Sequence, residues 1–205
     1  MNPITTNKMK TLIFASHNEN KAKEIRALLP VGLELKTLND IGLKEEIPET
    51  GMNLEENAKL KARFIFENYH DICFADDTGL EVECLNKEPG VFSARYAGPQ
   101  KSSEDNMAKL LVNMVDQTNR KAQFRTIFAF IDKDGNENLF EGIVEGEISL
   151  EKMGEKGFGY DPIFIPQGHS LSFAQMSAEE KNKISHRARA LRKFLDFLNS
   201  QSHFD

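Results

Sequence analysis

Three carboxylates stand in two short segments where they could bind a metal ion. Glu49 precedes a Thr-Gly pair, and the adjacent Asp76 and Asp77 precede another. Hard cations such as magnesium take oxygen ligands, usually one or two carboxylates completed by waters and substrate phosphates. Adjacent aspartates also allow one to bind the ion while the other orients or deprotonates a water molecule. Asp-Thr-Gly favours turns as well, so the spacing alone leaves a plain turn open as the alternative.

The segment from Ser16 to Lys21 has the composition of a phosphate-binding loop. It follows the apolar run Thr11 to Ala15 and precedes residues with helical spacing. Free N–H groups at a helix start favour a phosphate, Lys21 adds a point charge, and Ser16 and Asn18 can donate hydrogen bonds. The segment has no glycine and is therefore neither a Walker loop nor a GxGxxG motif. A solvated helix cap is the alternative.

An aromatic loop and three cationic or titratable residues near the C-terminal end could enclose a base. The glycines of Gly157-Phe-Gly-Tyr-Asp-Pro162 would let backbone approach a ligand, while Phe158 offers a stacking ring and Asp161 an acceptor. Lys181 and the pair His186-Arg187 follow on a predicted helix. An aromatic packing corner beside a solvated helix face is the alternative.

Lys61 shares a helical face with Ala58, Ala62 and Ile65 and would point partly inward, where it needs an anionic partner. A snorkelling side chain at a helix edge is the alternative. Taken together, the four features supply a phosphate cradle, a metal site, a base platform and counter-charges. That combination indicates a nucleoside triphosphate as the ligand.

Alternating strand-like and helix-like segments must position these residues. The spacing predicts an α/β architecture with a long mixed sheet and at most two lobes, forming one domain over residues 1–205. Capping residues Asn53 and Ser177 begin two of the helices, and Asp134-Gly135 joins two long strands into a hairpin. Gly79 is expected to turn the chain between two separate strands, 71–76 and 80–85. One last helix is expected from Ser177 to about residue 198, and the sequence leaves open whether the first ten residues are ordered.

The overall composition is that of an ordinary soluble protein. The 205 residues are 40% hydrophobic and 28% charged, and the formal charge of -6 disfavours a duplex-binding surface. No apolar run is long enough to cross a bilayer, and the first residues do not form a secretory signal, so we expect a cytoplasmic protein without a nucleic-acid or membrane partner. Cys73 and Cys84 have no metal-ligand or disulfide spacing.

Several long strings resemble the inosine triphosphate pyrophosphatase family, which removes non-standard purine nucleoside triphosphates from the nucleotide pool. They occur in family order over nearly the whole chain. The matching stretches are Phe14-Ala-Ser-His-Asn-Glu-Asn-Lys-Ala-Lys-Glu24, Glu49-Thr-Gly, Glu56-Asn-Ala-Lys-Leu-Lys-Ala62, Ala75-Asp-Asp-Thr-Gly79, Pro89-Gly-Val-Phe-Ser-Ala-Arg-Tyr96, Gly157-Phe-Gly-Tyr-Asp-Pro162 and Lys181-Asn-Lys-Ile-Ser-His-Arg187.

The resemblance implies an elongated fold with a central mixed sheet, a nucleotide cleft between two lobes, and a homodimer. It also implies a magnesium ion surrounded by Glu49, Asp76 and Asp77, with Asp77 as the general base. The residues that it implies for substrate binding are Ser16, His17, Asn18, Glu19, Asn20, Lys21, Lys61, Thr78, Phe158, Gly159, Tyr160, Asp161, Lys181, His186 and Arg187.

The expected activity is hydrolysis of ITP, dITP and XTP to the monophosphate and pyrophosphate. A pyrophosphatase for modified pyrimidine nucleotides would use similar phosphate chemistry and differ at the base pocket. A nucleotide-sensing module would keep the cleft without turnover, and the three carboxylates count against it.

Overall fold

The structure, a computed structural model, describes residues 10–201. Residues 1–9 and 202–205 lie outside this range, and with them nearly all of the N-terminal segment whose order the sequence left open. The expectation of one domain over residues 1–205 stays a prediction. None of the helices within residues 10–201 combines the length and the apolar character needed to span a bilayer.

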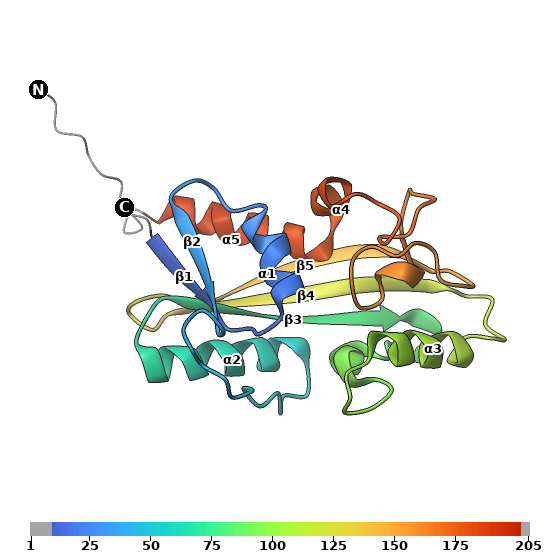
Figure 1. Cartoon of the computed structure of the whole chain (residues 1–205), viewed down its shortest axis with the longest axis horizontal. Coiled ribbons are helices and arrows are strands. Elements are labelled where there is room, and N and C mark those ends of the chain that lie inside the picture. Colours follow the sequence, from blue (N-terminus) through green and yellow to red (C-terminus); the bar gives the residue numbers. More distant parts are fainter. Residues whose placement is uncertain (1–9, 202–205) are drawn as a thin grey trace, which may run out of the picture.

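One mixed β-sheet runs along the molecule and contains, among residues 10–201, six strands in the order β2-β1-β3-β4-β5-β6. The strands are β1 (Lys10–Phe14), β2 (Leu33–Thr37), β3 (Cys73–Val82), β4 (Lys121–Ile131), β5 (Glu137–Ile148) and β6 (Phe164–Pro166). β1 is parallel to β2 and β3, whereas β3 to β6 are antiparallel. The long strands β3, β4 and β5 make the molecule elongated (Figure 1), and the predicted α/β fold with a long mixed sheet is confirmed.

Helices flank this sheet and pack against its strands in apolar clusters. The helices are α1 (Glu19–Arg26), α2 (Leu54–Tyr69), η1 (Glu83–Leu85), η2 (Gly90–Arg95), α3 (Ser103–Asn113), η3 (Asp161–Ile163), α4 (Ala178–Ile184) and α5 (His186–Ser200). α2 packs on one face of β3 through a cluster that includes Ile65 and Ala75, and α5 packs Phe194 against Phe74 on the other. α3 joins a third cluster around the far end of β3, at Leu80.

The expected helix caps are present. The Asn53 side chain accepts a hydrogen bond from the Glu56 amide, and Ser177 and Glu180 form a reciprocal capping box. The Asp134-Gly135 turn joins β4 and β5, as predicted. These local signals succeed because each depends on groups a few residues apart.

The predicted turn at Gly79 is wrong, because β3 runs without a break from Cys73 to Val82. A Cβ on Gly79 would lie 2.6 Å from the Gly90 carbonyl oxygen. Gly79 therefore allows η2 to approach the strand closely, a role that glycine also serves within strands. The continuous strand places Asp76 and Asp77 in the middle of the sheet.

The predicted last helix is divided into α4 and α5. Ser185 has extended backbone angles, ends α4 and caps α5 by accepting a hydrogen bond from the Ala188 amide. The Ser185 side chain offers a backbone amide an alternative hydrogen-bond acceptor, and this favours a helix cap over a position inside a continuous helix. The break makes His186 and Arg187 the first residues of α5, and both are buried.

Candidate active site

A cleft of about 730 Å³ opens over the middle of β3. The segment before α1, the strand β3 and the loop before η3 all contribute to its lining. The predicted site residues that line it are Ser16, His17, Asn18, Lys21, Glu49, Lys61, Asp77, Thr78, Phe158, Gly159, Tyr160, Asp161, Lys181, His186 and Arg187. Glu19, Asn20 and Asp76 are absent from this lining.

A second hollow of about 790 Å³ lies over the far ends of β3, β4 and β5. Its lining includes Glu81, Gln123 and Glu145 and none of the predicted site residues. Because the residues predicted to bind phosphate, metal and base line the first cleft, we take it as the candidate active site.

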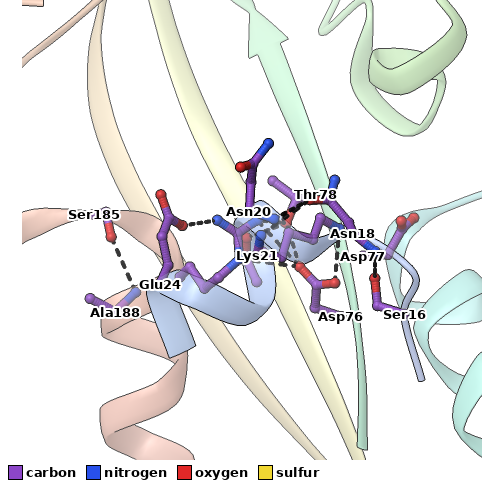
Figure 2. A network of polar contacts seen from close by, with 12 residues as sticks. Ser16, Asn18, Asn20, Lys21, Glu24, Asp76, Asp77, Thr78, Ser185 and Ala188 are labelled. Atoms are coloured by element: carbon purple, nitrogen blue, oxygen red, sulfur yellow. Dashed lines mark hydrogen bonds and ion pairs between the residues drawn. The ribbon is translucent and has the colours of Figure 1, made fainter. Parts of the chain in front are cut away.

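The Ser16–Lys21 segment is ordered by its own side chains (Figure 2). The Asn18 carboxamide oxygen accepts hydrogen bonds from the Asn20 and Lys21 amides at 3.1 Å each, so the helix-cap interpretation holds for these groups. The His17 ring lies 2.9 Å from the Asn39 side-chain oxygen, which ties the loop to the segment after β2. The loop therefore places Lys21 and Ser16 along the cleft.

Asp76 lies between two cations on the α5 face of β3 and is fully buried. Its Oδ1 accepts from Lys21 Nζ at 2.8 Å, and its Oδ2 lies 3.3 Å from Arg187 Nη2. The Thr78 hydroxyl donates to the same Oδ2 at 3.1 Å. Burial would raise the pKa of Asp76, but the attraction of Lys21 and Arg187 outweighs it and holds that pKa well below its ordinary value.

Asp77 points to the opposite face, because consecutive strand residues alternate. Its Oδ1 lies 3.3 Å from Lys61 Nζ, and the same ammonium lies 2.6 Å from Glu49 Oε1. Asn57 donates to Asp77 Oδ2 at 3.3 Å. Burial, assisted by the charge of Glu49, raises the pKa of Asp77 despite the opposing attraction of Lys61.

The three predicted metal ligands are therefore not brought into one cluster. Within residues 10–201, no group of three His, Cys, Asp or Glu side chains has the arrangement of a metal site. Glu49 and Asp77 do converge, since one ammonium contacts both carboxylates. Two oxygen donors aimed at one positive charge suit a hard divalent cation whose other ligands are waters and phosphates.

The loop of residues 157–160 before η3, here called the base loop, is held in place by the side chain of Asp161, which is 2% exposed. Its Oδ2 accepts from the Phe158 amide at 2.9 Å and from Lys181 Nζ at 2.5 Å. Lys181 Nζ also lies 4.9 Å from the centroid of the Phe158 ring. Gly157 has φ +76°, and a Cβ there would lie 2.1 Å from Asp161 Oδ2, so this position requires glycine.

His186 is buried at the same end of the cleft with its ring stacked on Phe124, the centroids 4.5 Å apart. Its Nδ1 is buried and has no hydrogen-bond partner in the described part of the chain. Burial, followed by the positive charges of Arg187 and Lys181, lowers the pKa of His186 well below its ordinary value. The ring is thus neutral at physiological pH.

Three further residues complete the site. Glu24 on α1 accepts from Lys181 Nζ at 2.7 Å and from the Arg187 guanidinium. Arg95 lies 3.5 Å from Glu49 Oε2, and Phe124 supports His186. Glu24 and Arg95 stand in strings that carried the family resemblance but had no assigned role. Phe124 has no local sequence signal, because its importance comes from a neighbour far along the chain.

Comparison with known proteins identifies the family of this chain. A profile described as the Ham1 family matches residues 12–197. The dITP/XTP pyrophosphatase of Flavobacterium psychrophilum is 52% identical over 92% of this chain and 99% of its own length. The dITP/XTP pyrophosphatase of Porphyromonas gingivalis is also 52% identical, over 93% of this chain and 98% of its own.

Solved structures show the same overall fold. The Ham1 protein of Staphylococcus aureus superposes with a TM-score of 0.84 at 39% identity, covering 93% of this chain and 98% of that one. The nucleoside-triphosphatase, or dITP/XTP pyrophosphatase, of Mycobacterium abscessus superposes with a TM-score of 0.74 at 40% identity, covering 91% and 99%. The resemblance found in the sequence is confirmed, and the chain belongs to the Ham1 family.

Proposed function

We propose that this chain hydrolyses the non-standard purine nucleoside triphosphates ITP, dITP and XTP to the nucleoside monophosphate and pyrophosphate. The observation that carries the proposal is one cleft lined both by the rings of Phe158 and His186 and by the charged side chains of Asp77, Lys61 and Lys21. Relatives that are 52% identical are named dITP/XTP pyrophosphatases, which supports the same substrate class.

Glu49 and Asp77 are the residues that would hold magnesium, because their oxygens converge on one positive charge. When bound there with the substrate, the ion would neutralise triphosphate charge and make a bound water more acidic. Arg95, which lies 3.5 Å from the other oxygen of Glu49, would help to orient that carboxylate. This assignment leaves Asp76 without a metal-binding role.

Asp77 is proposed as the general base that orients and deprotonates the water attacking the α-phosphorus. A carboxyl pKa raised by burial brings a base closer to the operating pH, which favours proton abstraction. Lys21 and Lys61 approach the same part of the cleft and would stabilise charge on the departing pyrophosphate. Thr78 would contact the substrate beside them.

Base selection is proposed to depend on donors around His186 and Arg187. A neutral imidazole and a guanidinium can donate to the 6-oxo group of hypoxanthine or xanthine, whereas the amino group of adenine would leave them unpaired. Phe158 would stack on the purine, with Gly159, Tyr160, Asp161 and Lys181 shaping the pocket. A homodimer and a cytoplasmic location complete the proposal.

A pyrophosphate-release assay with magnesium, run over ITP, dITP, XTP, ATP, GTP and methylated pyrimidine triphosphates, tests this function. We expect fast release from the first three. Faster release from the pyrimidines would instead indicate the pyrimidine-directed enzyme, and binding without release would indicate a nucleotide sensor. Glu49→Gln should have lower activity at a fixed magnesium concentration, while Glu137→Gln, which removes a carboxylate paired with Arg63 outside the cleft, should not.

A further inference from the structure

Asp76 is the most deeply buried carboxylate at the site, with no exposed surface, and it is absent from the cleft lining. Figure 2 shows it beneath α1, with contacts from Lys21 and Thr78. Its two oxygens are divided between two cations, since Oδ1 meets Lys21 and Oδ2 meets Arg187. The carboxylate is therefore saturated by protein donors.

The two cations come from elements far apart in the sequence. Lys21 lies in the first turns of α1, and Arg187 is the second residue of α5. Glu24, one turn after Lys21, binds Arg187 and Lys181 from the other side. The result is one chain of alternating charges from the phosphate end to the base end of the cleft: Lys21, Asp76, Arg187, Glu24, Lys181 and Asp161.

Metal binding at Asp76 would disrupt this series of alternating charges. A divalent ion at either oxygen would lie beside Lys21 or Arg187, both held within 3.3 Å of the carboxylate. Like charges at that separation repel strongly in a buried setting. Asp77 and Glu49, on the other face, share one ammonium, Lys61 Nζ, which would move aside for an ion, whereas each oxygen of Asp76 is paired with a cation of its own.

We propose that Asp76 is a positioning residue that holds the Lys21 and Arg187 side chains at fixed positions relative to each other. The base, bound by Arg187, and the phosphates, bound by Lys21, are then aligned together for the reaction. The inference rests on the proposed function, because it takes Lys21 as a phosphate ligand and Arg187 as a base ligand. Without the Asp76 charge, the two cations repel each other and separate, and a longer carboxylate in its place would shift both of them. Small misplacements of positioned groups can reduce the rate by about 100-fold.

The test compares Asp76→Asn and Asp76→Glu with Glu49→Gln and the remote Glu137→Gln. For the Asp76 variants we expect kcat on ITP to fall by about 100-fold and to change more than KM, because the lost interactions act in the transition state. The magnesium concentration for half-maximal rate should stay within about twofold of wild type, whereas Glu49→Gln should raise it by about 10-fold or more. The rate preference for ITP over ATP should also fall.

Two outcomes overturn the proposal. One is a kcat within about threefold of wild type in both Asp76 variants, far less than the about 100-fold loss that misplacement predicts. The other is an increase in the magnesium requirement equal to that of Glu49→Gln, which would make Asp76 a metal ligand. Asp76→Glu retains the charge and so keeps the test decisive if Asp76→Asn does not fold, which a melting curve will show.

Binding of inorganic pyrophosphate and of inosine monophosphate, measured by calorimetry, separates this inference from the proposed function. Both ligands should bind more weakly to the Asp76 variants and equally well to Glu137→Gln. If wild-type protein fails to hydrolyse ITP but both ligands bind more weakly to the Asp76 variants than to wild type, the proposed function fails and the positioning role stands. If hydrolysis is normal and neither ligand loses affinity, the positioning role fails alone.

Discussion

Replacing Asp77 by Asn should separate activity from stability. Asn preserves the shape of the side chain, and its oxygen can still accept from Lys61 Nζ, which lies 3.3 Å from Asp77 Oδ1. It cannot remove a proton from water. General-base catalysis contributes about 10²–10⁴-fold, equivalent to about 3 to 5 kcal/mol of activation free energy, so kcat should fall by at least about 100-fold.

The stability of the same variant should change in the opposite direction. Burial raises the pKa of the Asp77 carboxyl, which means that the folded state disfavours its ionised form. Above that folded-state pKa the charge costs stability, and Asn removes the cost. Lys61 keeps Glu49 as a partner at 2.6 Å. The free energy of unfolding of the metal-free protein at neutral pH should therefore equal or exceed that of wild type.

Asp76→Asn is the matched comparison, because its carboxyl pKa is lowered and its charge is paired with Lys21 and Arg187. Removing one partner of a buried ion pair costs about 3 to 5 kcal/mol. Urea unfolding in EDTA measures both variants, and steady-state kinetics with magnesium measures kcat. The reasoning is refuted if Asp77→Asn is the less stable of the two, or if its kcat stays within about tenfold of wild type, short of the loss expected for a missing base.

Other predictions concern the base loop, His186 and Cys73. Gly157→Ala should raise KM for ITP by about tenfold or more, because its Cβ would meet Asp161 Oδ2, whereas Gly168→Ala shares a positive φ without a nearby atom and should leave KM unchanged. The His186 ring should show no NMR titration between pH 5.5 and 8, since its pKa is well below the ordinary value; a midpoint near about 6.5 would contradict its burial. Cys73 should resist iodoacetamide at pH 8 in the folded protein, because burial raises the pKa of its thiol to about 12, and mass spectrometry showing its rapid alkylation would disprove this.

Much of the site could be predicted because its residue types are dictated by ligand chemistry. Phosphate, metal and purine groups each demand particular donors and acceptors, and these stand in short strings such as Gly157 to Pro162. The geometric division between Asp76 and Asp77 was harder to predict. Side chains point alternately to the two faces along a continuous strand. Because a turn is expected at Gly79, this rule is not applied from Asp76 to Asp77, and the opposite directions of the two carboxylates are not predicted.

Contacts between residues far apart in the sequence also could not be predicted from local patterns. Ser185 looks like an ordinary position in a helical stretch until its side chain caps α5, and that break places His186 and Arg187 in the cleft. Glu24 gains its role from two residues more than 150 positions away. Spacing rules describe neighbours on one element, whereas these contacts depend on how α1 and α5 pack against each other on one face of the sheet.

The most direct test of the proposed chemistry is hydrolysis of ITP by the wild-type protein with magnesium in water enriched in oxygen-18. If water attacks the α-phosphorus beside Asp77, mass spectrometry will find one labelled oxygen in inosine monophosphate and unlabelled pyrophosphate. Label in pyrophosphate, or products consisting of the diphosphate and inorganic phosphate, would contradict it.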